Sequence, residues 1–231
     1  EYPRRTKIVA TIGPKTQSVE ALEELIEAGV SVVRMNFSHG DHEFHKTTIT
    51  NARKAAANRK KIIAIMLDTK GPEIRTTLLE GGEVLLKKDQ ELILSTEEGL
   101  KGTSDKIYVD YKNITKVLQP GNIVLIDDGL IATKVTKIED DKVYTVVLNT
   151  GKLGEKKGVN LPNVKVDLPA ITERDRQDLL FGVKNGVDFI AASFVRKPED
   201  VEEIRKVLGA RGEGIKIISK IENAEGLEKF D

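Results

Sequence analysis

The chain has 231 residues, of which 39% are apolar, and this suffices for one large domain or two modest ones. Basic and acidic residues number 37 each, so no net field favours nucleic acid or an anionic membrane as a partner. The sequence contains no cysteine, which excludes disulfides and thiolate metal sites. It also lacks a long apolar leader and any run of 18 apolar residues, so we expect a soluble protein of the cytoplasm.

The N-terminal part predicts alternating strands and helices. Three short apolar runs have the pattern of buried strands, at residues 7–13, 30–38 and 61–68. Two helix-compatible segments lie between them, at residues 18–29 and 42–59. In the first helix Ser18 is a suitable N-cap and Gly29 follows the end. Continuously apolar strands that alternate with helices indicate a parallel sheet.

The pattern changes from about Ile74 to Pro169. Here short runs of Val, Ile and Leu are broken by Gly, Asp and Asn, and no convincing helix of ten residues occurs. Several short strands at such spacing predict a small β-barrel or sandwich inserted into the α/β scaffold.

The first pattern then resumes. Thr172 and Asp175 resemble a capping box, and Pro198 suits the first turn of a later helix. Residues 187–195 and 215–221 predict a fourth and a fifth strand. Five strands of this type indicate part of a (β/α) barrel or a doubly wound sheet. The predicted domains are 1–73, 74–169 and 170–231, the first and last belonging to one barrel.

Polar residues follow these strands, at the end where such folds place their sites. The second strand ends with Arg34, Asn36 and Ser38, the third with Asp68 and Thr69, and the fifth with Lys220 and Glu222. The Asn, Ser, Asp and Thr oxygens suit a hard cation, the two basic side chains suit an anion, and the glutamate suits a divalent metal. This collection predicts phosphoryl transfer, which depends on positioning and charge neutralisation.

Seven segments in order resemble pyruvate kinase: TKIVATIGP, RMNFSHG, LDTKGPEIR, KKGVNLP, ITERDRQDLLFGV, DFIAASFVRKPEDV and IISKIEN. The resemblance covers essentially the whole chain. It implies an α/β fold, namely a partial TIM (β/α)8 barrel that is interrupted by a small all-β barrel domain and truncated after the fifth strand. It also implies the glycolytic transfer of phosphate from phosphoenolpyruvate to ADP, giving pyruvate and ATP, and a full-length protein that is usually a homotetramer.

The resemblance also assigns site residues. It implies that Arg34 contacts the transferring phosphoryl group, that Lys220 stabilises charge on this group and on the enolate, and that Glu222 binds Mg²⁺ or Mn²⁺. The implied K⁺ ligands are Asn36, Ser38, Asp68 and Thr69. The implied nucleotide contacts are Asn36, Phe37, Ser38, His39, Arg75 and Lys157.

Structural interpretations of the same residues remain open. Arg34 alone is more often part of an ion pair at a strand end, Asp68–Thr69 could cap a turn, and Lys220 could simply pair with Glu222. Relatives continue with a sixth strand that carries a second metal-binding carboxylate. We therefore expect the 231-residue chain to be inactive without the remaining half. The alternative is an inactive folded fragment that binds nucleotide weakly or self-associates through open barrel edges.

Overall fold

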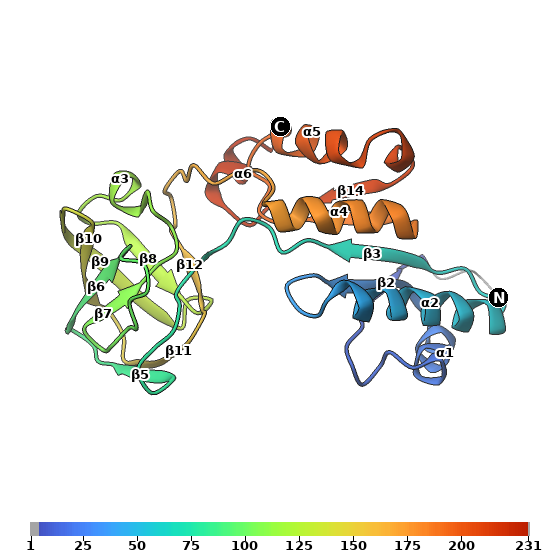
Figure 1. Cartoon of the computed structure of the whole chain (residues 1–231), viewed down its shortest axis with the longest axis horizontal. Coiled ribbons are helices and arrows are strands. Elements are labelled where there is room, and N and C mark those ends of the chain that lie inside the picture. The colour runs from blue at the N-terminus through green and yellow to red at the C-terminus, as the bar shows by residue number, and fades with distance from the viewer. Residues whose placement is uncertain (1–4, 231) are drawn as a thin grey trace. The chain divides into compact units, whose positions relative to one another are not determined.

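The computed structural model describes residues 5–230, which divide into two compact units (Figure 1). Within the described residues, the barrel unit runs to Pro72, resumes over Pro169–Glu222 and includes Lys229 and Phe230. The β unit consists of Glu73–Leu168 together with Asn223–Glu228. Within residues 5–230, no helix combines the length and the apolar character needed to cross a bilayer.

A five-stranded parallel sheet forms the centre of the barrel unit, in the order β1-β2-β3-β13-β14. Its strands are β1 (Ile8–Thr11), β2 (Val30–Asn36), β3 (Ala64–Asp68), β13 (Phe189–Ala192) and β14 (Lys216–Ser219). Apart from the insertion of the β unit, neighbouring strands follow one another along the chain and are joined by helices, which is the arrangement of a (β/α) barrel. The predicted fold class, a partial barrel in a mixed α/β protein, is confirmed.

Two helices of the barrel unit begin and end at recognisable caps. The helices of this unit are α1 (Val19–Ala28), α2 (His42–Asn58), α4 (Glu173–Asn185), α5 (Pro198–Leu208) and the 3-10 turn η1 (Ala210–Gly212). The Ser18 side chain accepts a hydrogen bond from the Ala21 amide, and Gly29 ends α1 at φ 106°. Thr172 and Asp175 form the complete capping box predicted for α4.

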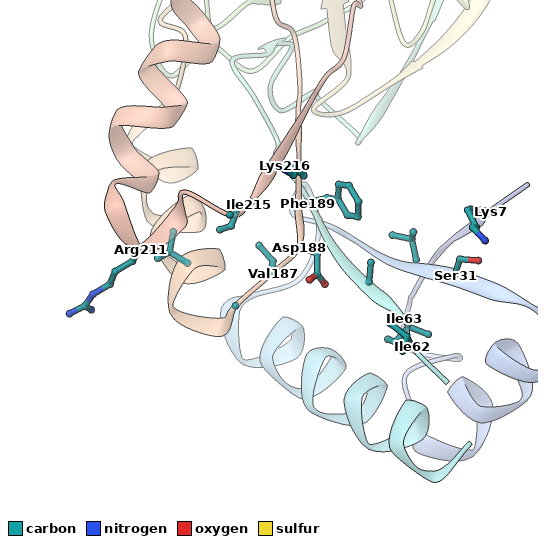
Figure 2. A pocket seen from close by; sticks show the side chains of 15 residues that line it. Lys7, Ser31, Ile62, Ile63, Val187, Asp188, Phe189, Arg211, Ile215 and Lys216 are labelled. Carbon is teal, nitrogen blue, oxygen red and sulfur yellow. The ribbon is translucent and has the colours of Figure 1, made fainter. Parts of the chain in front are cut away.

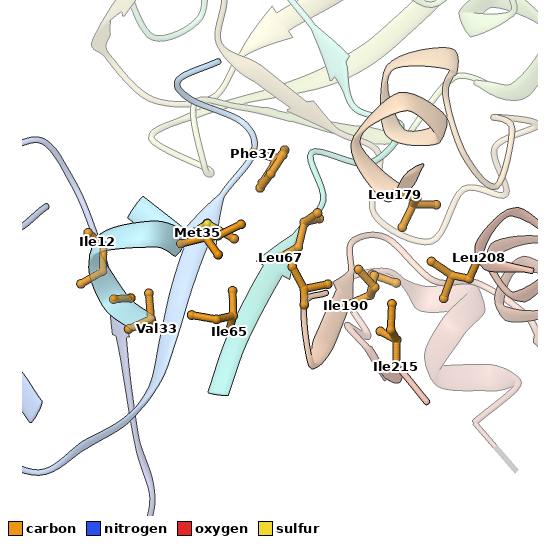
Figure 3. Packing of buried hydrophobic residues seen from close by; sticks show 14 of the residues in the cluster. Ile12, Val33, Met35, Phe37, Ile65, Leu67, Leu179, Ile190, Leu208 and Ile215 are labelled. Carbon is orange, nitrogen blue, oxygen red and sulfur yellow. The ribbon is translucent and has the colours of Figure 1, made fainter. Parts of the chain in front are cut away.

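The main core of the barrel unit lies between the sheet and these helices. Figure 3 shows Leu67 of β3 and Ile190 of β13 on the side of Leu179 and Leu208, which come from α4 and α5. The alternate residues Val32, Met66 and Ala191 form a smaller cluster of their own. The central strands are therefore buried on both faces, as their continuously apolar sequences predict.

The two outer strands are partly exposed, although their apolar sequences predict burial. Ile8 and Val9 of β1 are 42% and 48% exposed, and Ile218 of β14 is 41% exposed. Within the described residues, each of these strands has only one hydrogen-bonded neighbour in the sheet, so much of its surface remains uncovered. The predicted third strand is also shorter than expected, because it begins at Ala64, and Ile62 before it is almost fully exposed.

The β unit contains nine strands and two short helices. The strands are β4 (Ile74–Arg75), β5 (Glu83–Leu86), β6 (Glu91–Ser95), β7 (Lys106–Tyr108), β8 (Ile123–Ile126), β9 (Ile131–Glu139), β10 (Lys142–Val147), β11 (Gly151–Gly154) and β12 (Gly158–Asn160). Seven of them form one sheet in the order β4-β12-β8-β9-β10-β6-β7, and β5 pairs with β11. The helix α3 (Ile114–Val117) has four residues. The segment Asn223–Glu228 adds α6 (Ala224–Glu228).

The ends of the seven-stranded sheet meet. An antiparallel bridge joins Thr76, just after β4, to Val109, just after β7. The Asp110 amide also donates to the Arg75 carbonyl at 3.0 Å. These contacts close the sheet around its own apolar core, which is the arrangement of a small barrel.

Candidate active site

Side chains from three strands of the barrel unit converge on Asp68, the last residue of β3. Arg34 of β2 donates from Nε to Asp68 Oδ2 at 2.7 Å and from Nη1 to Thr11 Oγ1 at 2.5 Å. Lys220, directly after β14, donates from Nζ to Asp68 Oδ1 at 3.1 Å. The Asp68 carboxylate therefore holds one cation on each of its oxygens.

Exposure differs sharply within this cluster. The side chains of Arg34 and Lys220 are each 29% exposed, whereas that of Asp68 is 3% exposed. The buried carboxylate thus orients two cationic groups that reach solvent, where they can bind an anion. This also meets the requirement that a buried charge be paired.

Glu222 lies beside this cluster. Its Oε1 is 3.2 Å from Lys220 Nζ, and its Oε2 accepts a hydrogen bond from the Phe194 amide at 2.9 Å. The pairing of Lys220 with Glu222 that the structural interpretation predicted is therefore present. Because the glutamate side chain is 43% exposed, it can also serve as a metal ligand. Among the described residues, no group of three or more His, Asp or Glu side chains is arranged to hold a metal.

The oxygens predicted to bind K⁺ lie on two neighbouring strand ends. Asn36 and Asp68 are paired in the register of β2 and β3, and Thr69 follows directly. Asn36 Oδ1 accepts from the Ser38 amide at 3.0 Å, and Thr69 Oγ1 accepts from the Ser193 amide at 3.0 Å. This set of carboxylate, amide and hydroxyl oxygens has the chemistry that a hard cation requires.

The predicted nucleotide contacts fall into two groups. His39 and Ser38 are in the loop after β2, where His39 is exposed. The ring of Phe37 is instead buried in the core and stacks on His45, so it is not free to contact a nucleotide. The nucleotide contact predicted for Phe37 stays a prediction, and its backbone would have to make it.

Arg75 and Lys157 belong to the β unit. Arg75 pairs with Glu73 and donates from Nη1 to the Lys156 carbonyl at 2.8 Å. Lys157 Nζ is 3.0 Å from Asp127 Oδ1. Each cation has a partner within the β unit and is about a third exposed.

Ser193 is a site residue that sequence reasoning missed. It follows β13, and its hydroxyl accepts from Lys220 Nζ at 2.8 Å and donates to the Thr69 carbonyl at 2.6 Å. Ser193 thereby links the ends of three strands. The strand-end rule that identified Arg34, Asp68 and Lys220 would also have identified Ser193, had it been applied to the fourth strand.

A cavity of about 720 Å³ lies at the opposite ends of the strands. Figure 2 shows Ser31, Ile63, Asp188 and Lys216 around it, all at or near the starts of their strands. Since chemistry in (β/α) barrels occurs where the strands end, this cavity is separate from the candidate site.

Comparisons with known proteins agree with the architecture. A family model described as "Pyruvate kinase, barrel domain" matches residues 3–231. The chain is 53% identical to a pyruvate kinase of Schizosaccharomyces pombe, and this alignment covers 99% of the chain. It is 50% identical to a pyruvate kinase of Leishmania mexicana and 52% identical to one of Dictyostelium discoideum, over 99% and 98% of the chain.

The chain spans 46% of the length of each of these three relatives. Identity near one half over almost the whole chain, together with the match to the family model, leaves no ambiguity about its ancestry. The chain belongs to the pyruvate kinase family.

Proposed function

We propose that this chain supplies the phosphoryl-transfer machinery of a pyruvate kinase, which moves phosphate from phosphoenolpyruvate to ADP in glycolysis. The observation that carries the proposal is the pair of partly exposed cations, Arg34 and Lys220, held on the two oxygens of the buried Asp68. Phosphoryl transfer needs such pre-oriented positive charge, since the transferring group spreads negative charge over its oxygens.

Each residue of the cluster has its own proposed role. Arg34 binds and orients the phosphoryl group, and Lys220 neutralises charge on this group and on the enolate oxygen that forms as the phosphate leaves. Asp68 and Ser193 limit the positions that the Lys220 ammonium can take. Both cations therefore meet the reacting group already oriented, and little reorganisation is needed during the reaction.

Two cations complete the proposed site. Glu222 would hold Mg²⁺ or Mn²⁺, and Asn36, Ser38, Asp68 and Thr69 would hold K⁺. When bound, these ions neutralise phosphate charge and orient the substrates. Arg75, Lys157 and the loop after β2 would contact ADP or ATP. We place the completed protein in the cytoplasm as a homotetramer, without nucleic-acid or membrane partners.

The first test separates the chain from a completed enzyme. We expect negligible ATP formation from phosphoenolpyruvate, ADP, Mg²⁺ and K⁺ by the 231 residues alone. We expect robust formation when the remaining half of a relative is joined to them. Robust turnover by the chain alone would overturn the expectation that the 231 residues are inactive by themselves, and a completed enzyme without turnover would overturn the proposed function.

A substitution tests the role of Lys220. In the completed enzyme, Lys220→Met should lower kcat by about 10²-fold or more and change substrate binding less, because charge stabilisation in the transition state is lost. Lys216→Met is the matched control, since Lys216 is an exposed lysine at the start of the same strand. Equal kcat values for the two variants would exclude Lys220 from catalysis.

A metal titration tests Glu222. Glu222→Gln should raise the Mg²⁺ concentration needed for half-maximal rate, because a neutral amide binds a hard cation more weakly than a carboxylate does. An unchanged titration curve would argue against ligation by Glu222.

The second candidate function is self-association without turnover. The observation that favours it is the exposed apolar surface of the outer strands, which includes Ile8, Val9 and Ile218. Sedimentation of the 231-residue chain over a range of concentrations separates a monomer from an assembly. A strictly monomeric chain would eliminate this candidate.

A further inference from the structure

The loop between β2 and α2 carries two of the proposed ligand-binding residues, Ser38 and His39, and it begins directly after a third, Asn36, the last residue of β2. Internal bonds give the loop its turn: the His39 amide donates to the Asn36 carbonyl at 3.2 Å, and the Ser38 amide donates to Asn36 Oδ1 at 3.0 Å. These bonds are local. The position of the loop on the barrel unit must therefore be fixed by other groups.

His45, in α2, is one of these groups. Its ring is 2% exposed, and its Nε2 is 2.9 Å from the His39 carbonyl oxygen. Because a carbonyl oxygen only accepts hydrogen bonds, Nε2 must carry the hydrogen. The same ring stacks on Phe37, with centroids 3.9 Å apart and planes inclined by 15°. His45 therefore contacts both the backbone and a buried side chain of the loop.

Gly40 shows how closely the loop passes over this ring. Its φ is +74°, and a Cβ atom there would lie 3.1 Å from the Phe44 ring and 3.4 Å from His45 Nε2. Both the left-handed backbone and the close approach favour glycine at this position. The loop is thus fitted to the imidazole.

The surroundings of His45 disfavour a second proton on its ring. Burial lowers the pKa of His45, an effect opposed by its bond to His39 and by the nearby Asp178 carboxylate of α4. Its Nδ1 is buried and has no hydrogen-bond partner among residues 5–230. A second N–H on the ring would therefore be buried without an acceptor, which is costly.

A second side chain holds the same loop from another helix. Arg174, in α4, donates from Nη2 to the Phe37 carbonyl at 2.9 Å. Together with the Phe37 amide, which donates to the Asp68 carbonyl at 3.0 Å, this bond fixes the Phe37 end of the loop. His45 accounts for the end that carries His39.

We propose that His45 is a positioning residue: its Nε2–H bond to the His39 carbonyl orients the loop that presents Asn36, Ser38 and His39 to the cation and nucleotide. This proposal rests on the proposed function for the identity of the ligands. The loop geometry itself is independent of that function. The inference therefore has one test that needs no substrate and one that does.

The first test uses two substitutions that separate the hydrogen bond from the ring. His45→Gln keeps an N–H donor of similar reach, and His45→Phe keeps a flat ring but removes the donor. Amide hydrogen exchange of residues 37–41 in the chain is the measurement. We expect about three- to tenfold faster exchange of these amides in His45→Phe, the effect of losing one hydrogen bond, and near-original exchange in His45→Gln.

Amides in α1 and α4 provide the internal control. Faster exchange that is confined to the loop supports the proposal. If exchange became faster by the same factor in α1, α4 and the loop, His45 would act as an ordinary core residue, and the proposal would be overturned. Loop exchange that is unchanged in His45→Phe, or equally fast in both variants, would also overturn it, because the hydrogen bond would then not be what holds the loop.

The second test uses the completed enzyme. His45→Phe should raise the K⁺ concentration for half activation and the KM for ADP by about three- to tenfold, and kcat at saturation should change less. His45→Gln should restore both values. Unchanged K⁺ and ADP dependence in His45→Phe would contradict the proposal. A completed enzyme without any turnover would refute the proposed function, and the exchange measurement would still decide the role of His45.

Discussion

The two units bury their strands in different ways, and the difference explains where their functional side chains lie. In the barrel unit, four of the five residues of β3 are buried, because apolar clusters cover both faces of the central sheet. In the β unit, β10 strictly alternates partly buried and buried residues, because only one face looks into the small barrel.

The number of buried faces decides where a strand can carry charged side chains. A strand that is buried on both faces can present a charge only at its end, so Arg34, Asp68 and Lys220 gather where neighbouring parallel strands finish. A strand with one exposed face can carry charges along its length. Arg75 and Lys157 accordingly find their partners, Glu73 and Asp127, within the β unit itself.

The largest expected effect tests whether the two cores are energetically independent. Leu67 in the barrel unit and Leu94 in the β unit are both fully buried, and they belong to separate clusters. Replacing either with Ala should cost about 2–5 kcal/mol of unfolding free energy, through lost burial and the cavity that remains. We expect each change to lower the stability of its own unit most.

Two spectroscopic signals can follow the units separately in a urea titration. Tyr108, Tyr111 and Tyr144 all lie in the β unit and the chain has no tryptophan, so tyrosine fluorescence reports mainly on that unit. Helical circular dichroism reports mainly on the barrel unit, which contains the long helices. If Leu67→Ala and Leu94→Ala shifted both signals equally, the units would unfold as one and the contrast between them would be structural only.

The next largest effect on stability is expected at Gly71, whose backbone passes close to Ser193 at the candidate site. Gly71 has φ +72°, and a Cβ atom there would lie 2.8 Å from Ser193 Cβ. Gly71→Ala should cost about 1–3 kcal/mol and displace Ser193. Gly81 of the β unit is the matched control, since its φ is +75° but a Cβ atom there would have no neighbouring atom within 4 Å. Equal losses in thermal stability for the two variants would mean that backbone strain alone, without the clash, explains the cost.

A kinetic comparison distinguishes the two units in a completed enzyme. Lys157→Ala should raise the KM for ADP by about tenfold, the loss of one charge-assisted contact, and change kcat less. Lys152→Ala is the control, because Lys152 is also ion-paired within the β unit, to Glu83 at 2.8 Å, but is 71% exposed. A fall in kcat like that expected for Lys220→Met would mean that Lys157 acts on the reacting group.

The smallest expected effect is a pH dependence in the barrel unit. Burial lowers the pKa of His45 below its ordinary 6.5, while Asp178, His42 and Asp41 are the charged or titratable groups that act on it. The unfolded chain therefore binds the proton more readily, so this contribution to stability is present above about pH 6.5 and is lost as the pH falls towards the folded pKa.

Burial raises the pKa of Asp178, which acts in the opposite direction at lower pH. His45→Gln should thus show a flatter loss of stability just below pH 6.5 than the original chain in urea titrations at several pH values. If the unfolding free energy changed with pH equally in the two proteins, His45 would not contribute to the pH dependence of stability.

Local sequence signals predicted the helices and the strand ends well. Ser18, Gly29, Thr172 and Asp175 mark the helix caps that the structure contains, because capping depends on hydrogen bonds within a few residues. The strand-end rule brought Arg34, Asp68 and Lys220 together correctly, since register fixes which residues finish side by side.

The errors concern properties that are not local. The patterns of β1 and β14 predict burial, but Ile8, Val9 and Ile218 are exposed, because burial depends on how many neighbours a strand acquires. The ring of Phe37 packs on His45, eight residues further along the chain, and the local pattern did not predict this contact either. Side chains brought close by folding decide such cases.

The sequence by itself determined the alternation of elements, the inserted β unit and the polar residues at the strand ends that we propose for phosphoryl transfer, because these follow from periodicity and residue chemistry. The tertiary structure alone decided which partner each residue has. It placed Asp68 between Arg34 and Lys220, added Ser193 to them, and set His45 beneath the loop. The contacts among Arg34, Asp68, Ser193 and Lys220 join residues far apart in the chain, and only the packing of the strands brings them within hydrogen-bonding distance.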